Sequence, residues 1–535
     1  MPSSDCYPID VAPGLSRLFL DFCAGDAAVR PFYSSVPRET GWQKRCPVPH
    51  HWSEIVEVVA GQNALPEAAA AIQALKAGAG TVLTGQQVGL LGGPLYTPFK
   101  AATAIARARQ ATAAGRPHVA IFWLASEDHD FAEINHVVFP SRKELKKLVY
   151  AKAPANPVRV GGVLLDERIE PLMGQAWELL GSSDAMDALA AAYKPGRTFG
   201  AAFGDFYRKA FAAQGLLVLD ASGSEIHRLG APVLRAALER ADEFHAALQQ
   251  RNHELERAGY HVQVAVTPQS SLLFLIDERT GARMALKRTA ANSAEPQGLW
   301  QAGREKYTTA DLVGILVAEP ERISPAALLR PVFQDFLLGT SLIVGGPAEI
   351  AYFAQSAVLY ERILGRTTAA EPRLSATLIE PAIGELLRKH ELGLERVFKE
   401  SADGLAQLLA ARAMPVEGKR KLAAAGTALD AELDPLLEYM KAMDAGLGGS
   451  AETSARKMRY QMNRLRRLAA NFELQREGSL RRHAEAIERA LNPGGALQER
   501  VHGAAYYFAR YGFELAETLT ELATDPCPGH KAVWM

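Results

Sequence analysis

The sequence predicts an α/β protein whose core is a mostly parallel sheet, followed by an α-helical domain that forms an antiparallel coiled coil. From about residue 80 to 365, short β-rich apolar runs alternate with helical stretches, as in a parallel sheet covered by helices. After about residue 376 the apolar residues recur at helical spacing instead. At 535 residues the chain is also too long for one hydrophobic core, so it should be multidomain.

The first βαβ unit is the easiest element to read. Residues 81–85 form a short β-branched run, and residues 118–125 form the next strand. Between them lies a helix with Thr97 as N-cap, Pro98 in its first turn and Gly115 just past its end. This order predicts two neighbouring parallel strands joined by a helical crossover.

Further apolar runs predict more strands at 215–220, 261–266, 271–277 and 340–346, the last leading into a helix from Pro347. Two other stretches, 143–165 and 277–289, look like insertions with antiparallel strands. We therefore expect the following organisation: a core at 1–375 with insertions at roughly 140–197 and 224–322, a helical coiled-coil domain at 376–492, and a C-terminal segment at 493–535 that returns to the core.

The helical domain carries three sets of apolar residues. They are Leu394, Phe398, Leu405 and Leu408, then Leu429, Leu433, Leu436, Met440 and Met443, then Met458, Met462, Leu465, Ala469 and Phe472. The last two sets step by four and three alternately, which is the 3.5-residue seam of a coiled coil. We interpret the stripe as helix packed on helix, with a ligand groove as the alternative. We expect a turn at 444–452 and a kink or restart at Pro435.

Composition and charge narrow the class of protein. The chain is 48% hydrophobic and 22% charged, with 59 basic against 60 acidic side chains. A net charge of -1 gives no bulk field that attracts nucleic acid or anionic lipid. The N-terminus lacks an export signal, and no apolar run approaches the roughly 18 residues of a spanning helix. We expect a cytoplasmic protein that binds neither nucleic acid nor membrane.

The chain has four cysteines: Cys6, Cys23, Cys46 and Cys527. They match neither a disulfide framework nor a C-x-x-C zinc pattern, so we expect reduced thiols. Cys46 lies near His50 and His51, but structural zinc takes four ligands of recognised spacing. The sequence therefore gives only weak support for a metal site there.

A glycine-rich loop follows the first strand of the sheet. It contains Gly85, Gly89, Gly92 and Gly93. Neither a G-x-x-x-x-G-K-[ST] loop nor a G-x-G-x-x-G turn of the right context occurs. Bare N–H groups and the positive end of the following helix nevertheless suit an anionic ligand, with Gln86, Gln87 and Lys100 as further donors. The alternative is a turn that needs positive φ and tight packing.

A cluster of ionisable residues follows the second strand, at the same edge of the sheet. It comprises Glu127, Asp128, His129, Asp130 and Glu133. His129, oriented by a neighbouring carboxylate, could act as acid or base, and the carboxylates could hold a magnesium ion that carries a nucleotide's phosphates. The alternative is a solvated loop in which an aspartate caps a helix that starts near Phe131.

A third cluster repeats the arrangement of strand, double glycine, proline and helix. Arg330 lies on a helix, and Gly345 and Gly346 precede the helix that carries Glu349 in its first turn. Glu349 could bind a substrate ammonium group. Alternatively, it only complements the helix dipole.

At these three clusters the sequence resembles the cysteine ligase family of bacillithiol biosynthesis, called BshC. The resemblance rests on "TGQQVGLLGGPLYTPFKA", "FWLASEDHDFAEINHV", "SPAALLRPVFQDFLLGTSLIVGGPAEIAYFAQ" and the closing "GHKAVWM". With the helical region it covers nearly the whole chain. It implies a Rossmann-like core with inserted connecting segments, related to class I nucleotidyl transferases and aminoacyl-tRNA synthetases. It also implies a coiled coil that pairs two subunits.

The resemblance implies a ligase that joins the carboxyl of L-cysteine to the amine of glucosaminyl malate. Because a carboxylate oxygen leaves badly, the acid must first become an acyl phosphate or an acyl adenylate. We therefore expect ATP or ADP as cofactor, and Mg²⁺ could accompany it. The predicted catalytic residues are Glu127, Asp128, His129 and Asp130. The predicted substrate-binding residues are Gln86, Gln87, Gly92, Gly93, Tyr96, Lys100, Trp123, Arg330, Gly345, Gly346 and Glu349.

Two other functions stay open from the sequence alone. The chain could be a nucleotidyl-transferase-like enzyme that acts on another small acid. It could also be a non-catalytic scaffold that dimerises through the coiled coil, with a degenerate sheet domain.

Overall fold

The computed structural model describes residues 2–44, 48–150, 156–289, 299–525 and 527–535. The chain divides into two compact units. The first comprises Met1–Ser141, Leu145–Ala376 and Glu499–Lys531, and the second comprises Arg142–Glu144, Thr377–Gln498 and Ala532–Met535. None of the described helices is both long enough and apolar enough to cross a membrane.

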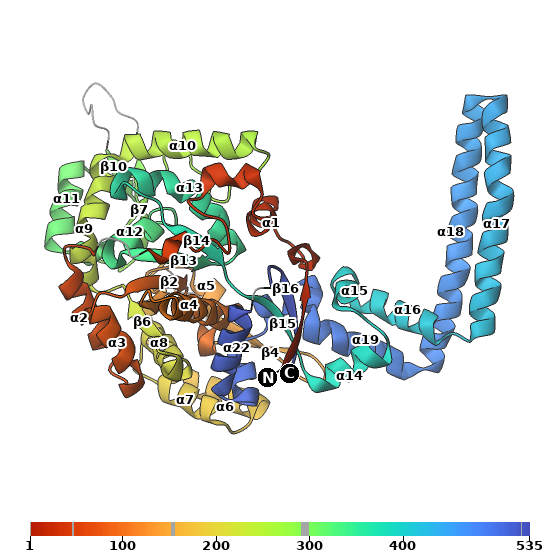
Figure 1. Ribbon diagram of the computed structural model, residues 1–535, viewed down its shortest axis with the longest axis horizontal. Helices are drawn as coiled ribbons and strands as arrows, with labels where there is room; N and C mark the ends of the chain where they lie inside the picture. The colour runs from red at the N-terminus through yellow and green to blue at the C-terminus, as the bar shows by residue number, and fades with distance from the viewer. Residues whose placement is uncertain (1, 45–47, 151–155, 290–298, 526) are drawn as a thin grey trace. The chain divides into compact units, whose positions relative to one another are not determined.

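A five-stranded sheet forms the core of the first unit, with the strand order β14-β13-β2-β3-β6 (Figure 1). Its strands are β2 (Gly80–Gln86), β3 (His118–Leu124), β6 (Leu217–Asp220), β13 (Thr340–Gly345) and β14 (Ala369–Pro372). Every neighbouring pair is parallel. The predicted α/β class with a mostly parallel sheet is confirmed, and so are four of its predicted strands. The edge strand β14 was not predicted.

Helices cover both faces of this sheet. The helices of the first unit are α1 (Arg17–Ala24), α2 (Trp52–Gln62), α3 (Ala69–Lys76), α4 (Tyr96–Ala113), α5 (Phe131–Ile134), α6 (Ile169–Leu180), α7 (Asp184–Ala192), α8 (Phe199–Ala210), α9 (Ser224–Glu239), α10 (Ala241–Arg257), α11 (Thr309–Ala318), α12 (Arg330–Leu338), α13 (Pro347–Leu364), α21 (Ala504–Tyr511) and α22 (Glu514–Thr524), and α20 (Gln498–Val501) begins at its boundary. The β2-α4-β3 and β13-α13-β14 crossovers run in opposite directions along the sheet. Because such crossovers are right-handed, α4 and α13 lie on opposite faces (Figure 1).

Successive side chains of β3 show the two-layer packing directly. Phe122 packs on Phe203 and Tyr207 of α8, with ring centroids 6.2 and 5.0 Å away. The next residue, Trp123, packs edge-on against Phe333 of α12 at 6.2 Å. Side chains alternate between the two faces of a strand, so a strand covered on both sides must be apolar throughout. This explains why the run HVAIFWL is entirely buried.

The start of α4 differs from the prediction. The helix begins at Tyr96, and no side chain caps it. Thr97, the predicted N-cap, already lies inside the helix, and its N–H donates to the carbonyl of Pro94 at 3.0 Å. The helix thus begins two residues earlier than predicted, through a backbone turn. Gly115 follows the helix with φ of +78°, as predicted for its end.

The insertions contain antiparallel strands, as predicted for their described parts. The smaller sheets use β1 (Ser3–Tyr7), β4 (His136–Pro140), β5 (Leu145–Val149), β7 (Leu273–Ile276), β8 (Arg283–Ala285), β9 (Lys287–Arg288), β10 (Trp300–Ala302), β11 (Glu305–Tyr307), β12 (Ile323–Pro325), β15 (Ser375–Ile379) and β16 (His530–Trp534). β4 and β5 pair antiparallel, and β7 lies between β12 and β8. The predicted strand at 271–277 therefore belongs to an antiparallel sheet.

The strand predicted at 261–266 is wrong, because this segment has no strand structure. The amide side chain of Gln355 on α13 takes the place of a neighbouring strand. Its Oε1 accepts from the N–H of Val264, and its Nε2 donates to the carbonyl of Val264, both at 2.9 Å. Val264 and Val266 thus pack half-buried against the core without pairing as a strand.

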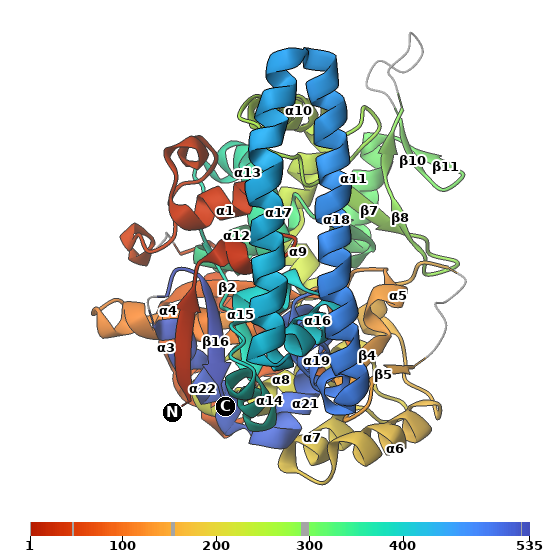
Figure 2. The ribbon, with the colours of Figure 1, turned by 90° about the vertical axis from the view of Figure 1, so that its right-hand side faces the viewer.

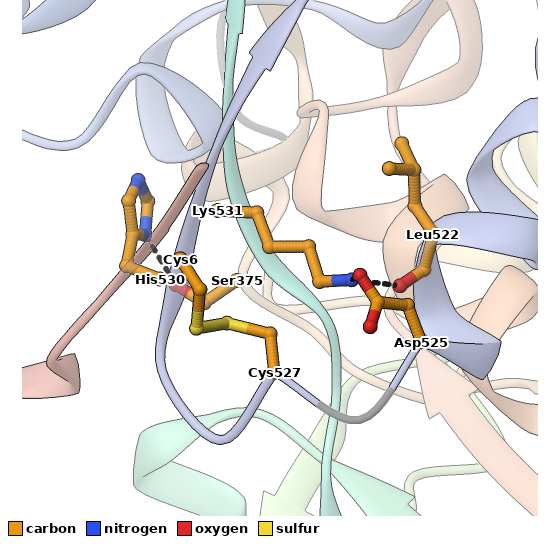
Figure 3. The surroundings of a disulfide bond; sticks show 7 residues. All are labelled: Cys6, Ser375, Leu522, Asp525, Cys527, His530 and Lys531. Carbon is orange, nitrogen blue, oxygen red and sulfur yellow. Dashed lines mark hydrogen bonds and ion pairs between the residues drawn. A yellow bond between two sulfur atoms is a disulfide. The ribbon is translucent and has the colours of Figure 1, made fainter. Parts of the chain in front are cut away.

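The expectation of reduced thiols is wrong for two cysteines. Cys6 in β1 and Cys527, just before β16, form a disulfide with Cα atoms 5.8 Å apart (Figure 3). They are 521 positions apart in sequence, and only the strand order β1-β16-β15 brings them together. Among the described residues Cys23 is a free, buried thiol. Cys46, which the weak metal motif near His50 requires, lies outside the described residues.

The second unit is helical. Its helices are α14 (Pro381–Lys389), α15 (Leu394–Lys399), α16 (Ala402–Ala413), α17 (Val416–Met443), α18 (Ala445–Arg476) and α19 (Gly478–Leu491). α17 and α18 lie side by side as a long hairpin (Figure 2). The turn predicted at 444–452 consists of Asp444 alone. The side chain of Asp444 accepts the N–H of Leu447 at 2.9 Å and so caps α18. Of the kink or restart predicted at Pro435, the restart does not occur, since α17 continues through this residue.

Only part of the predicted seam lies between the two long helices. Leu433 of the predicted seam is buried on α17, and Ala455, which the prediction does not include, is buried on α18. Five other seam residues are exposed, with between 49% and 62% of their surface accessible: Leu436, Met443, Met458, Leu465 and Phe472. The interpretation of the stripe as helix packed on helix therefore accounts for only part of it.

Candidate active site

A polar cavity of about 360 Å³ lies at the carboxyl ends of β2, β3 and β13, within the first unit. It is lined by nine of the residues predicted from sequence: Gln86, Gln87, Tyr96, Lys100, Trp123, Asp128, Arg330, Gly346 and Glu349. Six other predicted residues do not line it: Gly92, Gly93, Glu127, His129, Asp130 and Gly345. The three sequence clusters thus meet at one edge of the sheet, where α/β proteins usually bind ligands.

A direct hydrogen bond joins the first two clusters. The side-chain amide of Gln87, after β2, donates to Oδ2 of Asp128, after β3, at 2.6 Å. β2 and β3 are paired along their whole length, up to Gln86 opposite Leu124. Parallel pairing in this register therefore delivers both loops to the same place.

Within the glycine loop Gly85 lines the cavity, whereas Gly92 and Gly93 serve the packing of the loop. The N–H of Gly92 donates to Oη of Tyr193 at 3.2 Å, and Oη of Tyr207 donates to the carbonyl of Gly92 at 2.8 Å. A Cβ at Gly92 would lie 2.8 Å from the ring of Phe206. Gly92 and Gly93 have φ of +81° and +68°. The predicted use of these amides for an anion is therefore wrong, and the alternative of positive φ with tight packing holds.

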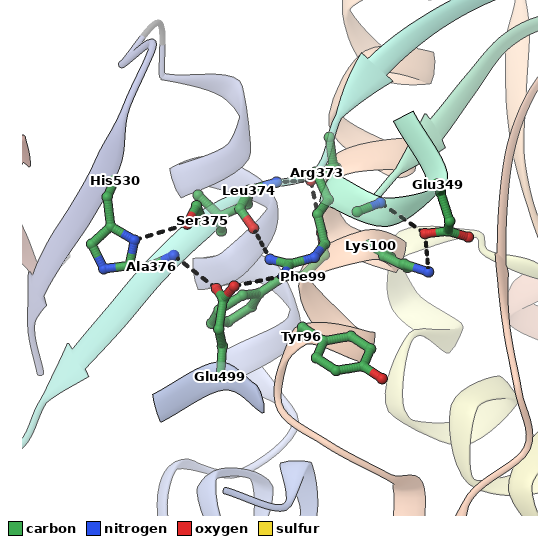
Figure 4. A network of polar contacts seen from close by, with 12 residues as sticks. Tyr96, Phe99, Lys100, Glu349, Arg373, Leu374, Ser375, Ala376, Glu499 and His530 are labelled. Carbon is green, nitrogen blue, oxygen red and sulfur yellow. Dashed lines mark hydrogen bonds and ion pairs between the residues drawn. The ribbon is translucent and has the colours of Figure 1, made fainter. Parts of the chain in front are cut away.

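Lys100 is buried beneath the cavity, and its ammonium group is fully engaged. Nζ lies 2.8 Å from the carbonyl of Gly85 and 2.9 Å from Oε1 of Gln86. It also lies 2.5 Å from Oε2 of Glu349 (Figure 4). An ammonium group has three hydrogens, so these acceptors use them all. Burial lowers the pKa of Lys100 even though Glu349 opposes this effect. Lys100 therefore holds the cavity wall together and has no hydrogen left for a ligand.

Glu349 joins this ion pair to the start of α13. Its Oε2 also accepts the N–H of Gly346 at 2.7 Å, which caps the helix (Figure 4). A Cβ at Gly345 would lie 3.0 Å from Cβ of Glu349, so Gly345 makes room for this contact. The alternative interpretation, in which Glu349 serves the helix end, is thus correct in part. Glu349 still lines the cavity.

A second buried ion pair was missed by sequence reasoning. Arg373 and Glu499 lie 2.6 Å apart, with 5% and 1% of their side chains exposed (Figure 4). The guanidinium of Arg373 lies 5.3 Å from the ring centroid of Tyr96, and Nζ of Lys100 lies 5.9 Å from it. Arg373 directly follows β14, so identifying that edge strand would have revealed it. Arg500, beside Glu499, also lines the cavity.

Asp128 and Arg330 provide the opposite charges of the cavity wall. Burial by itself raises the pKa of Asp128, but Arg330 and the hydrogen bond from Gln87 hold it below its ordinary value. Asp128 is thus ionised at neutral pH. No described carboxylate lies within ion-pair distance of Arg330, so its guanidinium can bind a substrate anion.

Glu127 lies behind the cavity wall, in a buried pair. Its Oε1 is 2.8 Å from Nε2 of His227 on α9, and both side chains are almost fully buried. Burial alone raises the pKa of Glu127, but His227 and Arg283 bring it below the ordinary value. Burial likewise lowers the pKa of His227, and Glu127 more than offsets this effect. Glu127 is therefore held as an ion by the protein itself.

The other two members of the acidic loop differ in environment. Asp130 is exposed, and its Oδ1 accepts the N–H of Glu133 at 3.1 Å as the N-cap of α5. The prediction of a capping aspartate before Phe131 is therefore confirmed. The ring of His129 contacts Arg283, and 36% of its side chain is exposed.

The carboxylates of this loop do not form a metal site of their own. Asp128 accepts hydrogen bonds from Gln87 and from the N–H of His129 at 2.7 Å, and Glu127 is paired with His227. Across the described part of the chain, no group of three or more His, Cys, Asp or Glu side chains is arranged to hold an ion. The residues present therefore do not fit an Mg²⁺ ion held by protein ligands alone.

A parallel sheet that gathers ionised side chains in a cavity at its carboxyl edge defines a Rossmann-like α/β protein that binds small polar ligands. The family model "Bacillithiol biosynthesis BshC, N-terminal Rossmann-like domain" matches residues 4–373, and that of its C-terminal coiled-coil domain matches residues 376–534. The chain therefore belongs to the BshC family of bacillithiol biosynthesis.

Individual relatives agree with this assignment. A protein of Koribacter versatilis named "Putative cysteine ligase BshC" is 41% identical over 547 residues, covering 99% of each chain. A protein of the same name from Solibacter usitatus is 32% identical and covers 97% of this chain and 98% of its own length. The resemblance inferred from the motifs is thus confirmed.

Proposed function

We propose that this chain is the cysteine ligase of bacillithiol biosynthesis, which joins the carboxyl of L-cysteine to the amine of glucosaminyl malate. Membership of the BshC family supports the reaction class. The observation that carries the proposal is the charged cavity itself. It offers Asp128 for a cationic amine and Arg330 for a carboxylate, and both substrates carry such groups.

We assign the roles of the cavity residues from their charge state. Asp128, which stays ionised, accepts a hydrogen bond from the attacking amine and stabilises the positive charge that develops on its nitrogen. Arg330 binds a substrate carboxylate, for which its planar fork is well matched. Gln87 fixes the orientation of the Asp128 carboxylate.

The reaction also needs an activated acid. Attack by the neutral amine forms the C–N bond and breaks the bond from the cysteine carbonyl to an oxygen carried by phosphate or AMP. The leaving oxygen takes the electron pair of that bond, and the proton lost by the amine passes to the released group or to water. We propose ATP as the source of that group, and Mg²⁺ would arrive with its phosphates rather than on ligands of this chain. Because ATP is supplied in the cytoplasm, we place the reaction there.

A direct assay tests the proposed function. The purified protein should form bacillithiol from L-cysteine, glucosaminyl malate and ATP, with a product mass that mass spectrometry identifies. Release of AMP and pyrophosphate would indicate an adenylate, and release of ADP and phosphate an acyl phosphate.

Omission of cysteine provides the control. If nucleotide turnover is unchanged without cysteine but depends on another small acid, the chain is a nucleotidyl-transferase-like enzyme on a different substrate. If ATP neither turns over nor raises the melting temperature, a non-catalytic scaffold is the better description.

We further propose that two copies associate through the exposed side of the α17–α18 hairpin. The exposed apolar residues fall at heptad spacing: Leu436 and Met443 on α17, and Met458, Leu465 and Phe472 on α18. Residues seven apart lie along one side of a helix, so they form continuous stripes. A second copy offers the same two stripes, which is the self-complementary contact that a twofold dimer requires.

Charge reversal on this stripe should dissociate the dimer. Wild type should elute with twice the mass of the 57.8 kDa chain in size-exclusion chromatography with light scattering. The Leu465→Glu/Phe472→Glu variant should elute as a monomer, because it places two charges in an apolar seam. Val317→Glu, at an exposed valine of α11, is the matched control and should stay dimeric. A monomeric wild type, or a dimeric double variant, would contradict this interface.

A further inference from the structure

A buried arginine lies directly against His129. Arg283 belongs to β8 and is only 3% exposed. Its Nε donates to Oγ of Ser324 at 3.1 Å, and one Nη donates to the carbonyl of Pro325 at 3.3 Å. Its guanidinium also lies 3.7 Å from the ring centroid of Phe274. Three contacts with two neighbouring strands therefore fix the guanidinium in place.

The remaining Nη of Arg283 determines which nitrogen of His129 carries hydrogen. It lies 3.0 Å from Nδ1 of His129. A guanidinium has only donors, so this contact is a hydrogen bond only if Nδ1 accepts. The imidazole hydrogen must then be on Nε2. Oδ1 of Asp128 is 3.6 Å from Nδ1, beyond hydrogen-bond distance, and it already accepts the N–H of His129.

The charges around the ring keep it neutral. Burial and the Arg283 cation lower the pKa of His129, while Asp128 and Asp130 oppose them. A protonated ring would turn Nδ1 into a donor that faces another donor. His129 is therefore poorly suited to the role of general base, since its one lone pair is engaged and its other nitrogen is an N–H.

We propose that Arg283 is a positioning residue that holds His129 as a neutral Nε2–H hydrogen-bond donor for an oxygen of the substrate. The inference rests on the proposed ligase function. When the amine adds to the activated carbonyl carbon, the carbonyl oxygen takes the electron pair and becomes negatively charged. A neutral imidazole N–H stabilises such an oxygen without giving up its proton. His129 lies outside the lining of the cavity, but it directly follows Asp128, which lines the cavity and to which we assign the binding of the amine.

The tautomer can be read from the wild-type protein. In protein labelled with ¹⁵N-histidine, loss of one signal set in His129→Gln identifies His129. We expect its Nδ1 to resonate as a bare acceptor and its Nε2 as an N–H at neutral pH. An Nδ1–H tautomer or an imidazolium would overturn the proposal without any variant of Arg283.

Variants of Arg283 then test the positioning role. In Arg283→Gln we expect a mixture of both tautomers and a raised pKa of His129, because a cation and a donor are lost. Arg283→Lys keeps the charge and should keep the pKa low. Arg279→Gln, at an exposed arginine of the same hairpin, should leave the His129 signals unchanged. Unchanged His129 signals in Arg283→Gln would overturn the proposal.

Ligation rates of the wild type and the variants distinguish a failure of the donor role of His129 from a failure of the proposed ligase function. His129→Gln and Arg283→Gln should each lower kcat for ligation on the order of 100-fold with little change in KM, as for loss of one oxyanion donor. If wild type ligates and both variants match it, the donor role is wrong and the ligase function stands. If wild type does not ligate, the proposed function falls and the donor role with it, while the tautomer remains assigned by the spectrum.

Discussion

Replacing Asp128 by asparagine should lower kcat for cysteine ligation by about 100-fold or more, the lower end of the range for a group that handles charge at a reacting atom. Asparagine keeps the size of the side chain but removes the charge that faces the amine. Its single oxygen can still accept the N–H of His129, and Gln87 can turn its own amide oxygen towards the new NH₂ group, so the loop should keep its shape. Product formation by mass spectrometry, measured with saturating cysteine and ATP, gives the rate.

The same change at an exposed aspartate provides the control for Asp128. Asp187 lies on the surface of α7, outside the cavity. Asp187→Asn should leave both kcat and the circular dichroism spectrum at the wild-type level. If Asp128→Asn ligates at the wild-type rate while folded, the cavity does not use this carboxylate and the assigned role is wrong.

Removing one partner of the Glu127–His227 pair should strongly destabilise the first unit. His227→Leu leaves the Glu127 carboxylate buried without a counter-charge, and breaking such a pair costs about 3–5 kcal/mol. Urea unfolding followed by tryptophan fluorescence measures the loss. The Glu127→Leu/His227→Leu variant should recover most of it, because replacing both charges by apolar groups removes the unpaired ion.

The pKa shifts of His227 and Glu127 predict how the stability of the protein depends on pH. The pKa of His227 is raised above its ordinary 6.5, so its contribution is complete below that pH and is lost as pH rises through the raised value. The pKa of Glu127 is lowered from its ordinary 4.5, so its contribution is present above that pH and is lost as pH falls through the lowered value. Stability measured at pH values that extend well below 4.5 and well above 6.5 should show both losses, and the double variant should lack them.

An exposed ion pair of the same kind is the matched control for His227. His253 and Glu256 lie 3.5 Å apart on α10, with 69% and 59% of their side chains exposed. His253→Leu should unfold at nearly the wild-type urea concentration, because water screens such pairs. A small effect of His227→Leu, comparable to this control, would contradict the buried-pair assignment.

The fold class and the place of the site could be predicted from the sequence because both depend on local patterns. The run of apolar residues at 118–125 identifies a strand covered on both faces, and a polar loop after such a strand must lie at its carboxyl edge. Asp128 and Gln87 were therefore expected near each other, and they are hydrogen bonded.

The roles of individual side chains could not be predicted in the same way, because they depend on partners distant in sequence. The sequence predicted that Lys100 binds an anion, but its ammonium group instead contacts Glu349 and two oxygens of β2. The sequence predicted a catalytic role for Glu127, but its carboxylate is paired with His227 at 2.8 Å. Nothing near either residue in the sequence indicates these partners.

The sequence by itself thus determined the parallel α/β core, the helical hairpin and the edge of the sheet at which charged loops gather. Periodicity and glycine placement act over a few residues, so they can be read along the chain. Only the tertiary structure decided which cysteines are bonded, which glycines are packed, and which ions face the cavity. Hydrogen bonding and burial join residues up to 521 positions apart, and these contacts decide whether a side chain remains free to act.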